Sequence, residues 1–111
     1  MHVGFILTKT PAEEGFNTFL KFLKIYIGNA DVTIYLLGNG VYGFMAKRSK
    51  FQTLITILKD SNHNTNVYAC LDDLNARGIS VPSLTEDVNS FVSYDEMVLD
   101  IMENMDQVFS F

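Results

Sequence analysis

The residue best suited to chemistry in this sequence is its single cysteine, Cys70. Cys70 follows the short apolar run 67–69 and precedes a helical pattern, so we expect it where a buried strand passes into a helix. Backbone N–H groups at the start of a helix stabilise a thiolate, whereas the nearby carboxylates of Asp72 and Asp73 disfavour it. Lys9 would offset these carboxylates if the loop after the first expected strand lies adjacent. Two interpretations of Cys70 therefore stay open, a nucleophile and a small, inert core residue.

Further candidate residues are expected at the same end of the sheet as Cys70. In open α/β sheets, ligands bind beyond the carboxyl ends of the strands. The binding residues that this rule selects are Lys9, Gly38, Asn39, Gly40, Tyr42, Ser93 and Tyr94. The glycines in the segment 38–40 can adopt positive φ or allow close approach of the backbone. Tyr42 or Tyr94 would cover a site there, although plain packing is the commoner use of a tyrosine.

Several other kinds of site are absent from the sequence. It contains no G-x-G-x-x-G motif, no Walker phosphate loop and no C-x-x-C pair. Zinc would need more ligands than Cys70, His2 and His63 can supply, so we expect no metal and no other cofactor. Asp72 and Asp73 are interpreted as stabilisers of a helix first turn, because adjacent helical side chains diverge by roughly 100°. The methionines near the C-terminus are interpreted as packing residues.

The composition predicts one compact domain over residues 1–111. The chain is 48% hydrophobic and 19% charged, which excludes disorder and favours a partly apolar surface suited to a subunit interface. Its net charge is −5 and its one basic cluster, 47–50, is short, which argues against nucleic-acid binding. The sequence lacks an apolar run of roughly 18 residues and a signal-peptide pattern. We therefore expect a soluble, cytoplasmic protein with no direct contact to nucleic acid or membrane.

Short apolar runs alternate with helical patterns along the chain, which is typical of βαβ units and a mostly parallel sheet. The pattern predicts strands at 3–7, 32–37, 67–69, 88–92 and 108–111. Helices are expected at 11–27, 51–59 and 71–77, and a last one after Ser93. Thr10 and Ser93 are the predicted N-caps of the first and last helices. In the last helix we expect Met97, Val98, Ile101 and Met105 to face the core.

The segment 70–79, Cys-Leu-Asp-Asp-Leu-Asn-Ala-Arg-Gly-Ile, resembles the cysteine segment of the DsrE-like sulfur-relay proteins. In that family a strand-end cysteine precedes a short helix that ends in Arg-Gly and an aliphatic residue. Residues 38–41 resemble the turn after the family's second strand, and residues 105–111 are similar to its closing strand. Where this chain has Ser93-Tyr94, relatives often have a glycine. The resemblance implies a three-layer α/β/α fold with a five-stranded, mostly parallel sheet.

The resemblance also implies an activity and partners. Cys70 would be a sulfurtransferase residue that holds a persulfide, accepts sulfane sulfur from a donor protein and passes it to an acceptor protein. Family members associate as trimers or hexamers of identical or sister subunits, so a homo-oligomer is expected. The family also includes subunits that assemble without transferring sulfur. The alternative is therefore a non-catalytic scaffold or small-ligand-binding module with an inert Cys70, and slow alkylation of the folded protein would favour it.

Overall fold

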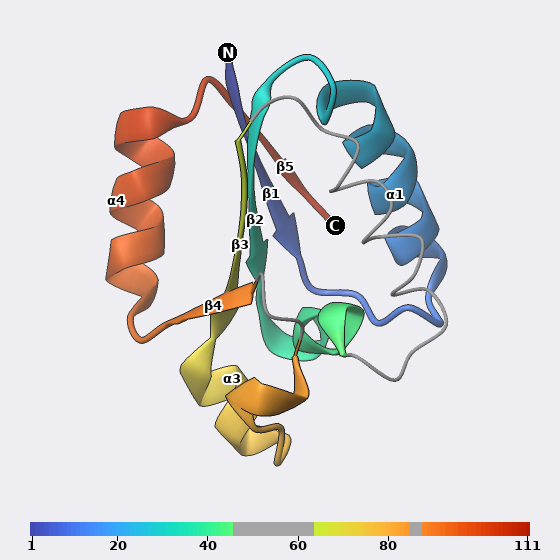
Figure 1. The fold of residues 1–111 in the computed structure, drawn as a ribbon, viewed down its shortest axis with the longest axis vertical. Coiled ribbons are helices and arrows are strands. Elements are labelled where there is room, and N and C mark those ends of the chain that lie inside the picture. Colours follow the sequence, from blue (N-terminus) through green and yellow to red (C-terminus); the bar gives the residue numbers. More distant parts are fainter. Residues whose placement is uncertain (46–63, 85–87) are drawn as a thin grey trace.

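The computed structural model describes residues 1–45, 64–84 and 88–111. Five parallel strands form one sheet in the order β4-β3-β2-β1-β5 (Figure 1). The strands are β1 His2–Leu7, β2 Asp31–Leu36, β3 Thr65–Cys70, β4 Val88–Phe91 and β5 Gln107–Ser110. Each lies within a few residues of a strand predicted from the sequence. The prediction of a five-stranded, mostly parallel sheet is confirmed.

Helices cover both faces of this sheet, so the predicted three-layer α/β/α fold is also confirmed. The α-helices are α1 Glu14–Tyr26, α3 Leu71–Ala76 and α4 Tyr94–Asn104, and the short 3-10 helices are η1 Gly38–Phe44 and η2 Val81–Ser83. Figure 1 shows α1 on one side of the sheet and α4 on the other. The predicted helix 51–59, the basic cluster 47–50 and His63 lie outside the described residues.

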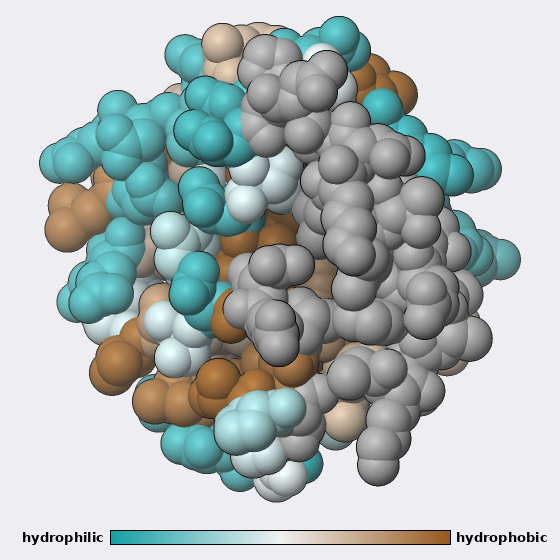
Figure 2. Space-filling model, in the orientation of Figure 1, coloured by the Kyte–Doolittle hydropathy of each residue, from teal (hydrophilic) through white to brown (hydrophobic). Residues whose placement is uncertain are grey.

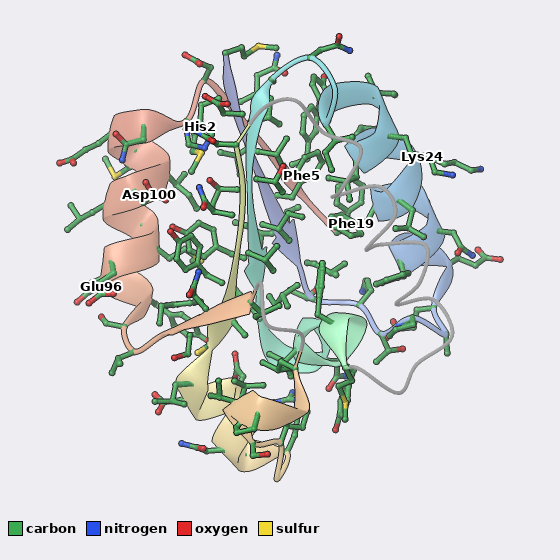
Figure 3. The ribbon with its side chains drawn as sticks, viewed as in Figure 1. His2, Phe5, Phe19, Lys24, Glu96 and Asp100 are labelled. Atoms are coloured by element: carbon green, nitrogen blue, oxygen red, sulfur yellow. The ribbon has the colours of Figure 1, made fainter. Side chains whose placement is uncertain are left out.

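Side chains alternate in direction along each strand, so the hydrophobic core is divided between the two faces of the sheet. Phe5 belongs to the larger core under α1, where its ring meets that of Phe19 edge to face at 5.7 Å (Figure 3). The smaller core under α4 contains Tyr35, Cys70, Phe91 and Met97. Successive strand residues point to opposite faces, so Ala69 belongs to the α1 core and Cys70 to the α4 core. Cys70 therefore lies between the sheet and α4.

The first helix begins later than the sequence predicted. Glu13 N–H donates to the Thr10 carbonyl at 3.1 Å, which closes a separate turn, and the extended backbone of Glu13 then ends that turn. The helix starts at Glu14, so Thr10 is not its N-cap and Pro11 is not its first residue. The expected contact between Glu13 and Thr10 does form, because Thr10 N–H donates to Glu13 Oε1 at 3.0 Å. The residues that predicted a helix start, Thr10 and Glu13, therefore stabilise the preceding turn instead.

The last helix follows the predictions more closely. Asp95 N–H donates to Ser93 Oγ at 3.1 Å, which confirms Ser93 as the N-cap. Met97 is buried, and Ile101 and Met105 pack against the same core, as expected. Val98 was wrongly placed inward: its side chain is 45% exposed, because the helix directs Met97 and Ile101 towards the sheet instead. Of the helices that the structure describes, none has the length and apolar content needed to cross a membrane.

Candidate functional site

Cys70 occupies the junction predicted for it, as the last residue of β3 and the N-cap of α3. The short helix that follows ends at Ala76 with Arg77 as its C-cap, and the next residue, Gly78, has the φ of +66° that suits a glycine after a helix. Gly78 N–H donates to the Asn75 carbonyl at 3.1 Å, and Ile79 N–H donates to the Leu74 carbonyl at 3.0 Å. The Cys70 side chain is only 2% exposed. The thiol is therefore held at the carboxyl end of a central strand but covered.

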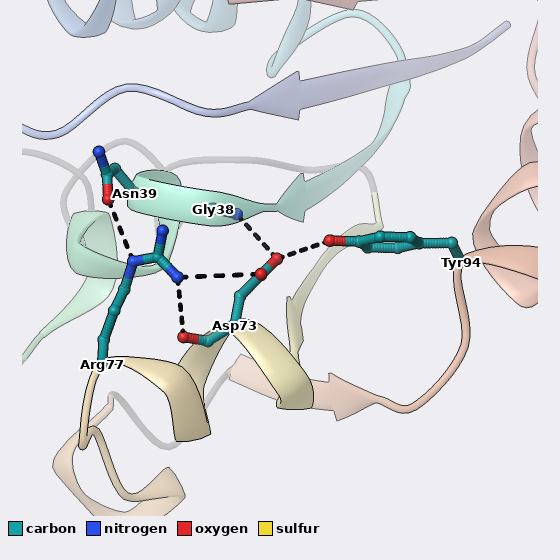
Figure 4. A network of polar contacts seen from close by, with 5 residues as sticks. All are labelled: Gly38, Asn39, Asp73, Arg77 and Tyr94. Carbon is teal, nitrogen blue, oxygen red and sulfur yellow. Dashed lines mark hydrogen bonds and ion pairs between the residues drawn. The ribbon is translucent and has the colours of Figure 1, made fainter.

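Asp73 connects three segments beside this thiol. Its Oδ2 accepts a hydrogen bond from Gly38 N–H at 2.8 Å and another from the Tyr94 hydroxyl at 2.9 Å (Figure 4). Cys70 is the N-cap of the helix whose first turn carries Asp73, and its thiol is close enough to Asp73 and Tyr94 to influence the pKa of each. The carboxylate thus joins α3 to the end of β2 and to the start of α4. A buried thiol in a purely apolar core would lack these polar neighbours.

Arg77 supports the same carboxylate from the C-cap of α3, one residue beyond the last turn in which the sequence predicted it. Its Nη1 donates to the Asp73 carbonyl oxygen at 3.1 Å and lies 3.8 Å from Asp73 Oδ1. Its Nε donates to Asn39 Oδ1 at 3.1 Å. Arg77 therefore attaches α3 to η1 and holds the Asp73 side chain from a second direction, as Figure 4 shows.

These contacts determine the protonation states of Asp73 and Tyr94. Burial raises the pKa of Asp73, but the hydrogen bonds from Gly38 and Tyr94, the nearby Cys70 thiol and the charge of Arg77 outweigh it and lower the pKa below its ordinary value of 3.8. The hydrogen bond with Asp73, burial and the neighbouring Cys70 raise the pKa of the Tyr94 phenol. At neutral pH Asp73 is a carboxylate that accepts, and Tyr94 is a neutral phenol that donates.

The glycines of the turn after β2 act as the sequence suggested. Gly38 has a φ of +52°, a value that favours glycine. A Cβ atom on Gly40 would lie 1.9 Å from the Leu7 carbonyl oxygen, so only glycine allows η1 to approach the end of β1 so closely. Leu37 N–H donates to that same oxygen at 3.0 Å. The turn thereby presents the Gly38 N–H to Asp73.

The structure brings together only some of the predicted site residues. Gly38, Asn39, Tyr94 and Cys70 belong to one network with Asp73, and Ser93 caps the adjoining helix. Lys9 lies elsewhere, against α1, because a Cβ atom on Gly15 would be 2.8 Å from Lys9 Cγ. Tyr42 packs against the core under α1, which is the other face of the sheet from Cys70.

Two features of the site were not predicted from the sequence. The first is the bridging role of Asp73, for which the four-residue spacing between Asp73 and Arg77 was the available signal. The second is Tyr35, whose hydroxyl donates to Asp100 on α4 and whose ring stacks on Tyr68 at 5.4 Å. Burial and the Asp100 carboxylate raise the pKa of Tyr35. Figure 3 shows Asp100 on α4.

A metal site finds no support in the part of the chain that the structure describes, where no group of three or more His, Cys, Asp or Glu side chains could hold an ion. Met97 and Met105 pack in the α4 core, whereas Met102 is 76% exposed.

The chain is similar to proteins of one family and one fold. A family model described as "DsrH like protein" matches residues 9–107. Among solved structures, a protein of unknown function from Methanobacterium thermoautotrophicum, MTH1491, superposes with a TM-score of 0.82 at 14% identity, covering 98% of this chain and 97% of that chain. The ychN protein from E. coli gives a TM-score of 0.79 at 19% identity, covering 100% and 99%. No curated protein matches the chain. At these identities, the two solved structures show the shared fold alone.

Proposed function

Because this chain belongs to the DsrH-like family, we propose that it is a sulfur-relay subunit that carries sulfane sulfur as a persulfide on Cys70. One observation carries the choice of residue. Cys70 is the chain's single thiol, and it lies at the carboxyl end of a central parallel strand, beside the hydrogen-bonded pair Asp73 and Tyr94. The carboxyl ends of parallel strands are where α/β proteins of this type place their reactive groups.

The proposed step is an exchange between sulfur atoms. The Cys70 thiolate, having given its proton to solvent, attacks the outer sulfur of a donor persulfide, R–S–SH. A new S–S bond forms at Cys70 while the S–S bond of the donor breaks, and its electron pair leaves on the donor thiolate. The transferred sulfur keeps its proton, so no oxidant or reductant is consumed. An acceptor thiolate then attacks the same outer sulfur and leaves Cys70 as a thiolate again.

A second function is favoured by the burial of the thiol. Cys70 is only 2% exposed, as an unreactive core thiol would be. In this alternative the chain is a non-catalytic scaffold or ligand-binding subunit, and Cys70 is a core residue with a weak S–H donor. The two functions differ in one observable property, namely whether the folded protein can take up sulfane sulfur.

Association with other subunits forms part of the proposal. α4 exposes Val98, Leu99 and Met102, with exposed fractions of 45%, 57% and 76%. Figure 2 shows apolar surface among polar residues on the α4 side of the molecule. Such residues favour a protein interface, and we assign it to further copies of this chain, as a trimer or hexamer, or to sister subunits. Sulfur donor and acceptor proteins of the cytoplasm would be the other partners.

The function is tested by counting sulfane sulfur. Folded protein is incubated with inorganic polysulfide, freed of excess reagent and treated with cyanide, which removes sulfane sulfur as thiocyanate. The proposal predicts close to one thiocyanate per chain for the wild type and none for Cys70→Ser. If the wild type yields none unless it is first unfolded, the scaffold function is correct instead.

A further inference from the structure

The burial of Cys70 has a consequence for the proposed relay. With 2% of its surface exposed, the Cys70 side chain cannot meet a persulfide on another protein in this conformation. A side chain that covers the thiol must therefore move before any exchange takes place. The residues packed with Cys70 in the α4 core include Tyr35 and Phe91, both 5% exposed, and Met97, 8% exposed. These are anchored in the core and are costly to displace.

Tyr94 differs from these residues. Its ring contacts Phe91, the residue that pairs with Cys70 between β3 and β4, and its hydroxyl reaches Asp73 in the helix turn that Cys70 begins, yet Tyr94 is 48% exposed. It is the first residue of α4, and the ring contact found for it, with Phe91, is loose, with ring centroids 6.3 Å apart. The hydroxyl of Tyr94 is held by its hydrogen bond to Asp73 Oδ2. A rotation of this side chain into solvent would break that bond but would leave the core packing in place.

We propose that Tyr94 is a movable cover over Cys70, held closed by the hydrogen bond from its hydroxyl to Asp73, and that Cys70 exchanges only when this bond opens. The fixed side of the latch is Asp73, which Gly38 N–H and Arg77 hold from two other directions. The moving side is the exposed tyrosine. The biological meaning of the latch rests on the proposed sulfur relay, whereas the opening itself can be measured with any thiol reagent.

The electrostatics favour a latch that is closed at rest. Asp73 is ionised, and a hydrogen bond from a phenol to a carboxylate is stronger than one between neutral groups. Tyr94→Phe removes the hydroxyl and keeps the ring. It should therefore raise the fraction of molecules in which residue 94 has moved away from Cys70 by roughly tenfold or more. The Asp73→Asn side chain can still accept from Tyr94, but as a neutral amide, so its effect should be smaller than that of Tyr94→Phe.

The test is the rate at which a maleimide labels Cys70 in the folded protein, followed by intact mass. Tyr94→Phe should label at least about tenfold faster than wild type, and Tyr94→Ala faster still. Tyr26→Phe is the matched control, because it removes a tyrosine hydroxyl bonded to Gln107 Oε1 at 3.4 Å on the α1 face. It should label at the wild-type rate.

The free energy of unfolding of each variant, measured in urea, distinguishes a latch from a purely structural role of Tyr94. If Tyr94 acts as a latch, Cys70 in Tyr94→Phe should be labelled faster than global unfolding of that variant would allow. The labelling rate should also stay constant at low urea concentrations, because opening the latch exposes little surface. Wild-type labelling rates in Tyr94→Phe, or acceleration fully explained by global unfolding, would overturn the latch. Failure of the sulfur relay is a different result: Cys70 would then label faster in Tyr94→Phe, yet no variant would take up sulfane sulfur.

Discussion

The Tyr94 hydroxyl donates a hydrogen bond of 2.9 Å to the Asp73 carboxylate, and this contact joins the first residue of α4 to the first turn of α3. The two residues are 21 positions apart in the chain and meet beside the Cys70 thiol. Through Asp73 the same contact reaches Gly38 at the end of β2. The first turns of η1, α3 and α4, at the carboxyl end of the sheet, are thus connected through one carboxylate.

Replacing that carboxylate should change the response of the protein to acid. The pKa of Asp73 is lower in the folded chain than its ordinary value of 3.8, so Asp73 contributes stability that is fully present above pH 3.8 and lost as pH falls through the folded pKa. Asp73→Asn should cost about 1–3 kcal/mol at neutral pH and flatten the acid limb of the stability curve. Urea unfolding at a series of pH values measures both effects.

The matched control for this change is Asp72→Asn. Asp72 lies in the same turn of α3, but its side chain is exposed. The substitution removes the same charge without breaking the contacts to Gly38 and Tyr94. A loss of stability at neutral pH as large as that of Asp73→Asn would show that charge in the first turn, and not the bridge, is responsible.

Gly40→Ala should be severely destabilising. The added methyl group would lie 1.9 Å from the Leu7 carbonyl oxygen, which is backbone and cannot move aside. We expect a loss of more than about 3 kcal/mol or failure to fold. Gly28→Ala is the control, since a Cβ there meets nothing within 4 Å, and its stability should stay within about 1 kcal/mol of wild type. Equal stability of both variants would contradict the close approach of η1 to β1.

Tyr35→Phe tests the contact between the sheet and α4. The variant keeps the stacked ring but removes the hydroxyl that donates to Asp100, at a cost of about 1–2 kcal/mol. Burial and Asp100 raise the pKa of Tyr35, so its contribution is fully present below the ordinary pKa of 10.0 and is lost as pH rises further. Wild type should therefore lose stability above pH 10 more steeply than Tyr35→Phe. Identical alkaline limbs in urea unfolding would contradict this.

Leu99→Lys tests the proposed interface on α4. Leu99 is 57% exposed, so a lysine fits there without disturbing the fold, but it would place a charge in an apolar contact. The proposal predicts a wild-type oligomer and a smaller particle for the variant, as measured by light scattering after gel filtration. Ile25→Lys, at a 60% exposed position on α1, should keep the wild-type mass. A wild-type mass for Leu99→Lys would place the interface elsewhere.

The position of Cys70 could be predicted from the sequence because its signals are local. An apolar run, a cysteine, two acidic residues and a terminal Arg-Gly follow one another within the segment 67–78, and each has a known preference for a strand, a helix start or a helix end. The first residue of α1 could not be predicted in the same way, because Thr10 and Glu13 form the same contact in a turn as they would at the start of a helix.

The polar network around Cys70 could not be predicted, since it depends on contacts between distant residues. Asp73 meets Gly38 and Tyr94 across separations of 35 and 21 residues, and no spacing in the sequence encodes those meetings. Lys9 shows the converse: it follows β1, at the end of the sheet expected for the site, but its side chain lies along α1. Strand order and register decide such contacts, and they follow from the folded sheet as a whole.

The most direct test of the account is the intact mass of native protein after exposure to inorganic polysulfide, with Cys70→Ser alongside. The wild type should gain the mass of one sulfur atom, a thiol reductant should remove the gain, and Cys70→Ser should show none. Tyr94→Phe should reach the same gain sooner. An unchanged mass for the folded wild type and for Tyr94→Phe, with a gain only after unfolding, would contradict it and identify Cys70 as an inert core thiol.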